Sequence, residues 1–161
     1  MDGEKRMLLR YLHAQRAAVL AILEELGEPA LTTPLLPSGW TPLGMVEHLG
    51  YAERYWFQEI VTGTAGLLAW PDDDHAPLTT PRSPDVVFAF YREQCRRSDE
   101  IFAATPLATP PAGRHPGPPE EEEVADLRGV VLHMIEETAR HAGQLDVVRE
   151  LLDGRTGLGP R

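Results

Sequence analysis

Four stretches of this chain carry apolar residues at spacings of three and four, and segments rich in proline and glycine separate them. Such spacing places the apolar side chains on one face of an α-helix. The pattern predicts helices over about residues 3–26, 41–62, 84–104 and 127–152, with long irregular connections over about 64–82 and 105–119. We therefore expect an all-α fold, an antiparallel four-helix bundle with long proline-rich connections, in a single domain over residues 1–161.

Residues at the expected helix ends support these boundaries. Thr41 and Ser83 each stand directly before a proline, which pairs a capping hydroxyl with the residue best tolerated in the first helical turn. Asp126 is a suitable N-cap for the last helix, and Gly154 is well placed for its C-terminal cap. These signals predict where helices begin and end, but not how the helices pack.

The balance of charge limits the partners of the protein. Fifteen lysines and arginines stand against 25 aspartates and glutamates, for a formal net charge of −10. A negative surface repels nucleic acid and anionic lipid. No apolar run approaches the roughly 20 residues that cross a membrane, and Cys95 is the only cysteine, which excludes an internal disulfide. We expect a cytoplasmic protein that binds neither nucleic acid nor membrane.

Three polar residues of the last expected helix are spaced four apart: His133, Glu137 and His141. This spacing stacks their side chains in one row, along the edge of the apolar stripe. Burying such groups is costly unless something pairs with them. Glu137 and His141, joined by a histidine from another helix, would form a His₂Glu metal site with an open position for water or substrate. The spacing also fits side chains that form only hydrogen bonds.

Other residues around this row are candidates for ligand or substrate contacts. His48 lies at the margin of the apolar stripe of the second helix, where a satisfied core histidine is the alternative. Helical phase predicts five residues that could line a substrate cavity: Tyr55, Trp56, Glu59, His133 and Gln144. Core packing or a hydrogen bond to a ligand is the alternative for each of them. Cys95 falls in an apolar set, which indicates an inert buried thiol.

Two segments carry a family resemblance. Residues 38–49 (SGWTPLGMVEHL) with 51–57 (YAERYWF), and residues 133–150 (HMIEETARHAGQLDVVRE), resemble the paired helix signatures of the DinB-like superfamily. Within it the chain is most similar to the branch of mycothiol-dependent maleylpyruvate isomerase and mycothiol S-transferases. The resemblance implies a four-helix bundle, and places one divalent metal ion on His48, Glu137 and His141. Zinc is the expected metal, with nickel, manganese and iron as alternatives.

The resemblance also implies an activity: the metal-assisted transfer of a mycothiol-like thiol to an electrophilic small molecule. The alternatives are a metal-dependent hydrolase and a non-catalytic metal-binding protein of the stress response. Such proteins are often dimers, so a homodimer is expected. Gln144 departs from close transferase-like relatives, which often have histidine there. The chain ends just past the expected bundle and lacks the isomerases' additional C-terminal domain, so we do not expect maleylpyruvate isomerisation.

Overall fold

The computed structural model describes residues 3–64, 76–114 and 124–157. Residues 65–75 of the first long connection predicted from the sequence, and residues 115–119 of the second, therefore lie outside the described residues. The helices, in chain order, are α1 (Gly3–Ile22), α2 (Glu28–Thr32), α3 (Pro42–Glu53), η1 (Arg54–Val61), α4 (Pro84–Ala104) and α5 (Leu127–Asp153). No strand occurs in the described part of the chain, which confirms the all-α prediction.

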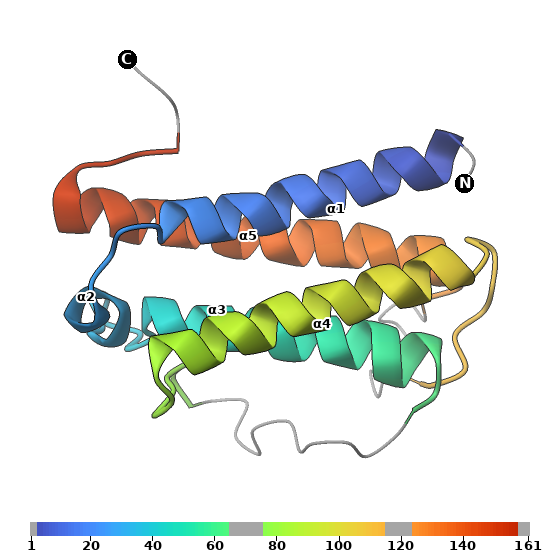
Figure 1. The fold of residues 1–161 in the computed structure, drawn as a ribbon, viewed down its shortest axis with the longest axis horizontal. Coiled ribbons are helices and arrows are strands. Elements are labelled where there is room, and N and C mark those ends of the chain that lie inside the picture. Colours follow the sequence, from blue (N-terminus) through green and yellow to red (C-terminus); the bar gives the residue numbers. More distant parts are fainter. Residues whose placement is uncertain (1–2, 65–75, 115–123, 158–161) are drawn as a thin grey trace.

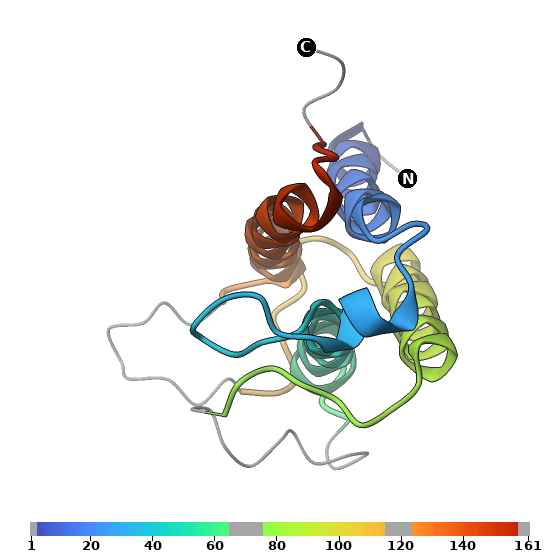
Figure 2. The ribbon, with the colours of Figure 1, turned by 90° about the vertical axis from the view of Figure 1, so that its left-hand side faces the viewer.

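The long helices form two parallel pairs that run in opposite directions. Figure 1 shows α1 along α5 and α3 along α4, and Figure 2 views the helices nearly end-on. Arg128 binds Glu4 near the beginnings of α5 and α1, and Arg149 donates to the carbonyl oxygens of Ile22 and Glu24 near their ends. The antiparallel arrangement thus holds between the pairs. Within each pair the helices are parallel rather than antiparallel as predicted. In the second pair, for example, the chain returns from the end of η1 to the opposite end of the molecule before α4 begins, so that α3 and α4 run in the same direction.

The first helix is shorter than its periodicity predicts. α1 ends at Ile22 rather than near residue 26, and the chain turns through Glu25, whose φ of 64° lies in the left-handed region. Carbonyl groups at a helix end lack partners within the helix. Here the buried guanidinium of Arg149 donates hydrogen bonds to two carbonyl groups near the end of α1, those of Ile22 and Glu24, although Arg149 is more than 120 positions away in the sequence. The short helix α2 follows, in the stretch between the first two helices predicted from the sequence.

The second predicted helix changes its winding part-way. α3 is α-helical, and its continuation Arg54–Val61 is a π-helix with wider turns. The segment after α4 is bonded to the end of this π-helix, because Gly113 donates its backbone N–H to the carbonyl of Ile60 over 2.8 Å. A Cβ at Gly113 would lie 2.2 Å from the carbonyl oxygen of Glu59, so only glycine allows this approach. The π-helix and the connection to α5 are therefore held together.

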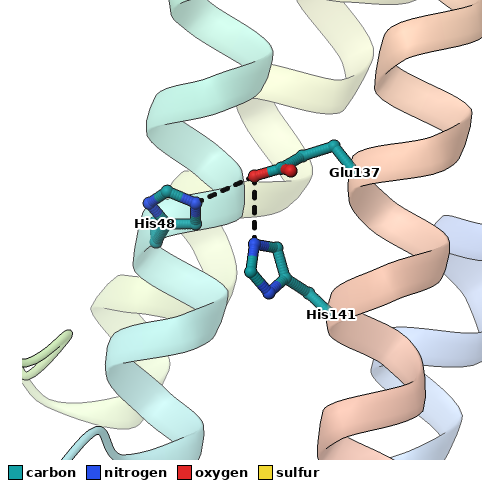
Figure 3. Close-up of side chains that lie close together, drawn as sticks. All are labelled: His48, Glu137 and His141. Carbon is teal, nitrogen blue, oxygen red and sulfur yellow. Dashed lines mark hydrogen bonds and ion pairs between the residues drawn. The ribbon is translucent and has the colours of Figure 1, made fainter.

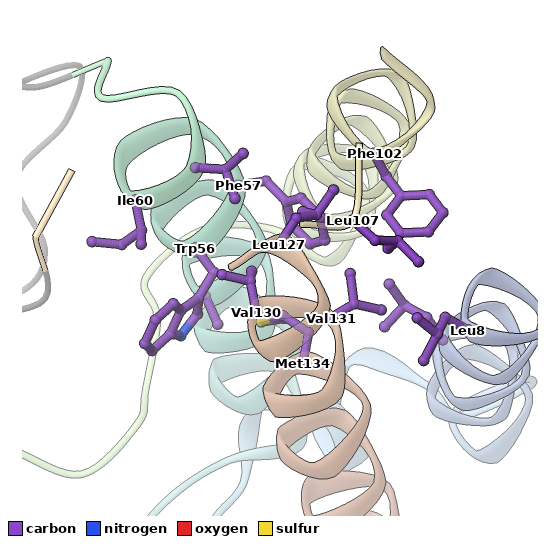
Figure 4. Close-up of a cluster of buried hydrophobic side chains, with 13 residues drawn as sticks. Leu8, Trp56, Phe57, Ile60, Phe102, Leu107, Leu127, Val130, Val131 and Met134 are labelled. Carbon is purple, nitrogen blue, oxygen red and sulfur yellow. The ribbon is translucent and has the colours of Figure 1, made fainter. Parts of the chain in front are cut away.

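The apolar core consists of two clusters along the length of the helices. Figure 4 shows the first, where side chains from α1, η1, α4 and α5 converge around Trp56, Phe102 and Met134. The second surrounds Tyr91 and Leu145, nearer the other end of the molecule. Along α5, residue 137 falls between Met134 of the first cluster and Ala142 of the second. The polar row predicted from the sequence thus lies where the two apolar clusters meet.

Candidate metal centre

His48, Glu137 and His141 come together between α3 and α5. Each of them offers a ligand atom, and these atoms all lie within 4.8 Å of one another. The Nε2 atoms of His48 and His141 lie 3.1 and 3.0 Å from the same carboxylate oxygen, Oε1 of Glu137 (Figure 3). Among the described residues no other group of three or more histidine, cysteine or acidic side chains is arranged in this way.

The beginning of α3 is fixed in a way that determines the position of His48. Thr41 caps this helix, since its hydroxyl accepts the N–H of Gly44 over 3.0 Å, and Pro42 occupies the first turn. The backbone of Leu78 crosses directly over Gly44. A Cβ at position 44 would lie 2.0 Å from the carbonyl oxygen of Leu78. That carbonyl accepts the N–H of Thr41. His48 follows one turn later, on the side of α3 that faces α5.

Glu137 and His141 are positioned by one helix, as their spacing predicted. They stand four residues apart on α5, and the two imidazoles of the site meet edge to face, with ring centroids 5.1 Å apart. The side chains of His48, Glu137 and His141 are 19%, 23% and 14% exposed. The group is therefore largely enclosed by protein, but each of its side chains keeps some exposure to solvent.

The electrostatics of the site depend on close hydrogen bonds. Hydrogen bonds from His141 and His48 hold the pKa of the Glu137 carboxyl far below its ordinary range, against the opposite effect of burial. Burial alone would lower the pKa of His141, but its hydrogen bonds to Glu137 and Gln144 raise it above the ordinary value. The structure therefore favours an ionised Glu137 carboxylate, beside a His141 imidazole that keeps its proton to a higher pH than an ordinary histidine.

These contacts fit a divalent cation. Two imidazole nitrogens face one carboxylate oxygen, and each such contact requires a proton on the nitrogen unless a cation takes its place. Two histidines and one glutamate are the ligand set of catalytic zinc sites that keep a position open for water or substrate. Nickel, manganese and iron also accept nitrogen and oxygen ligands. His48, Glu137 and His141 could thus hold a metal ion, but the donor set does not select which one.

The aromatic candidates pack against one another beside this group. The ring of Trp56 lies 4.4 Å from that of His133 and 5.4 Å from that of Tyr55, measured between centroids. Trp56 belongs to the first apolar cluster. His133 precedes Glu137 by one turn of α5 and contacts the indole instead of joining the three-residue group. Contact of these side chains with substrate stays a prediction.

The two remaining candidates have polar partners. Glu59 accepts a hydrogen bond from Arg54 over 3.1 Å. Gln144, predicted to line a substrate cavity, has its amide oxygen 2.7 Å from Nδ1 of His141. The spacing of three between these residues on one helix could have indicated this contact from the sequence. A role of Glu59 or Gln144 in binding substrate also stays a prediction.

A second polar group, which the sequence analysis missed, lies on another side of α3. Arg16 donates two hydrogen bonds, of 2.7 and 2.6 Å, to the two carboxylate oxygens of the fully buried Glu53, and a third to Asp99 over 2.7 Å. Cys95 lies in the same region. This pairing joins α1, α3 and α4. It has no signal in the sequence, because the partners are 37 and 83 residues apart.

The fold and the site together define an all-α protein with a candidate metal centre of two histidines and one glutamate between two of its helices. Over residues 7–154 the sequence matches the family model of mycothiol-S-transferase, and the chain belongs to this family. The resemblance seen in residues 38–57 and 133–150 is thereby confirmed. No curated protein matches the sequence at a significant level. No helix in the described part of the chain is both long and apolar enough to cross a membrane.

Proposed function

We propose that the protein is a metal-dependent S-transferase, which conjugates mycothiol to an electrophilic small molecule. One observation carries the proposal: His48 of α3 meets Glu137 and His141 of α5 in a largely enclosed group, in a chain of the mycothiol-S-transferase family. A divalent cation held there would favour the thiolate form of a nearby thiol, which is the reactive nucleophile. Zinc is our proposed metal, in a cytoplasmic homodimer built from one domain per chain.

The residues of the chain contribute binding groups and access. His48 and His141 direct their Nε2 atoms inward, and Glu137 supplies the negative charge that holds a cation. His133, one turn before Glu137 on α5, packs against the buried ring of Trp56 and would offer an electrophile the edge of an apolar surface. The thiol proton leaves to solvent. The sulfur then forms its bond to the electrophilic carbon while that carbon's bond to its leaving group breaks, and the group departs with the bonding electrons, as bromide does from monobromobimane.

The sulfur must come from the cosubstrate, because Cys95 is unsuited to the reaction. Burial, assisted by the nearby Glu53 carboxylate, raises the pKa of the Cys95 thiol to about 12. The side chain packs beside the second apolar cluster, close to the Arg16–Glu53 pair rather than to the three-residue group. The only cysteine of the chain is therefore neither ionised nor placed to attack a substrate.

A labelling experiment tests this reading of Cys95. At pH 8 a thiol with a pKa of about 12 is ionised in only about one molecule in ten thousand. We expect iodoacetamide to modify the folded protein slowly, and the urea-unfolded protein at the rate of a free cysteine, as followed by mass spectrometry. Cys95→Ala should also keep its transferase rate within about twofold of wild type. Loss of activity in a folded Cys95→Ala variant would contradict an external sulfur.

The activity itself is tested with a panel of thiols. Zinc-loaded protein is incubated with monobromobimane and mycothiol, bacillithiol or glutathione, and the fluorescent conjugate is measured. We expect the loaded protein to accelerate the mycothiol reaction above that of free zinc, and Glu137→Ala, treated in the same way, to give no acceleration. If no thiol reacts faster with the loaded protein, the S-transferase proposal fails and a hydrolase or a non-catalytic metal-binding protein becomes the better reading.

A further inference from the structure

Gln144 makes a contact with the imidazole of His141 that affects the orientation and protonation of the ring. The amide oxygen Oε1 of Gln144 lies 2.7 Å from Nδ1 of His141, while Nε2 on the opposite edge of the ring lies 3.0 Å from Oε1 of Glu137. Both nitrogens of this imidazole are thus engaged. Gln144 stands at an exposed position of α5, so its contact with His141 is not imposed by burial.

The amide oxygen can only accept a hydrogen bond, so Nδ1 of His141 must be the donor. A neutral imidazole has one proton, and a proton kept on Nδ1 leaves the lone pair on Nε2. Nε2 is the atom that points toward His48 and Glu137 (Figure 3). The contact with Gln144 therefore selects the tautomer that a metal ligand needs, and it fixes the ring about its Cβ–Cγ bond.

We infer that Gln144 is a positioning residue of the metal centre, which holds His141 as the Nδ1–H tautomer with Nε2 directed at the cation. The inference rests on the proposed function only in requiring that the centre binds a metal. Of the roles that the sequence left open for Gln144, contact with substrate or a hydrogen bond to a ligand, the inference takes the second. Outer hydrogen bonds of this kind typically change metal affinity by about 10- to 100-fold.

The position of Gln144 separates this role from a structural one. Its partner is three residues away on the same helix, so the contact does not join different parts of the fold. Substitution of an exposed helical residue by one of similar helix propensity usually has little effect on unfolding. A variant at this position should therefore lose metal affinity without losing stability in the metal-free state.

The experiment compares two variants of Gln144. Gln144→Met keeps the length of the side chain but lacks a strong hydrogen-bond acceptor, whereas Gln144→Glu keeps an acceptor oxygen. The control is Gln15→Met, the same change on α1, a helix that supplies none of the three ligands. Zinc affinity of the full chain is measured by competition with a chromophoric chelator. We expect Gln144→Met to bind zinc about 10-fold more weakly, Gln144→Glu to bind at least as tightly as wild type, and the control to be unchanged.

Nitrogen-15 NMR of histidine-labelled, zinc-loaded protein measures the exchange of the Nδ1 proton of His141, which would not change if Gln144 served only the stability of the fold. We expect His141 in the wild type to show a slowly exchanging proton on Nδ1, and Gln144→Met to lose that protection. Equal zinc affinity of wild type and Gln144→Met, or an unprotected Nδ1 in the wild type, would overturn the inference. Failure of the wild type to bind zinc would overturn it together with the metal centre. Zinc binding without thiol transfer would overturn only the proposed S-transferase.

Discussion

Glu137→Ala should purify without metal from cultures in which the wild type carries close to one divalent ion per chain, as measured by elemental analysis. Glu137 supplies the only carboxylate of the group and lies against both histidines, so its loss leaves two neutral ligands and no negative charge. Changing a residue that only supports a ligand already costs about 10- to 100-fold in affinity, and removing a ligand should cost more. Glu136→Ala is the matched control, because it removes an adjacent, exposed carboxylate from the same helix.

The pH dependence of metal binding provides a second measurement on the same centre. In the metal-free protein the pKa of His141 is raised by Glu137 and Gln144, so a proton occupies this imidazole to a higher pH than in an ordinary histidine. A cation must displace that proton. Zinc affinity should therefore be greatest above the raised pKa and fall as the pH is lowered through it, with protons released on binding. A full complement of metal in Glu137→Ala would contradict the ligand assignment.

Glu53→Ala should destabilise the fold by about 3–5 kcal/mol in urea unfolding, because it leaves the buried guanidinium of Arg16 without its main partner. Asp99, which is 36% exposed, remains as a weaker partner. The matched control is Glu100→Ala, which removes an exposed carboxylate that pairs with Arg96 on the surface of α4. Exposed pairs contribute little, so the control should unfold close to wild type.

A double variant separates the cost of an unpaired charge from the cost of lost packing. Replacing both partners by apolar residues of similar size, as in Arg16→Met with Glu53→Leu, should recover most of the stability lost in Glu53→Ala. A double variant as unstable as the single one would indicate that shape, and not charge, dominates at this position. Near-wild-type stability of Glu53→Ala alone would contradict a stabilising role for the pair.

The sequence predicted the fold to the extent that local patterns determine it. Apolar spacing and capping residues predicted the long helices, and α4 and α5 begin where Ser83 and Asp126 suggested. The early end of α1 was not predictable in this way, because Arg149 reaches its terminal carbonyls from the far end of the chain. The π-helical turns after Glu53 were also missed, since periodicity marks a buried face but not which carbonyl each N–H selects.

The candidate site was predictable in two stages. The spacing of Glu137 and His141 on one helix indicated a shared face, which the structure confirms. Nothing local indicated which histidine of another helix joins them, because that depends on the packing of α3 on α5. The family resemblance supplied His48, and the structure places it in the group. For Gln144 the sequence left contact with substrate and a hydrogen bond to a ligand both open, since helical phase does not distinguish a side chain that faces a ligand from one that faces a cavity; its contact with His141 came from the structure.

The parallel pairing of the first and last helices also has a consequence for the order of events during synthesis. α1 packs along α5, with contacts that join residues 124 and 127 positions apart. The contact of His48 with the carboxylate of Glu137 likewise joins residues 89 positions apart. Contacts this distant in sequence close large loops of chain and form late. The nascent protein cannot complete its core, or bring His48 beside Glu137, until α5 has left the ribosome, so a metal ion could bind the three-residue group only after α5 has been made.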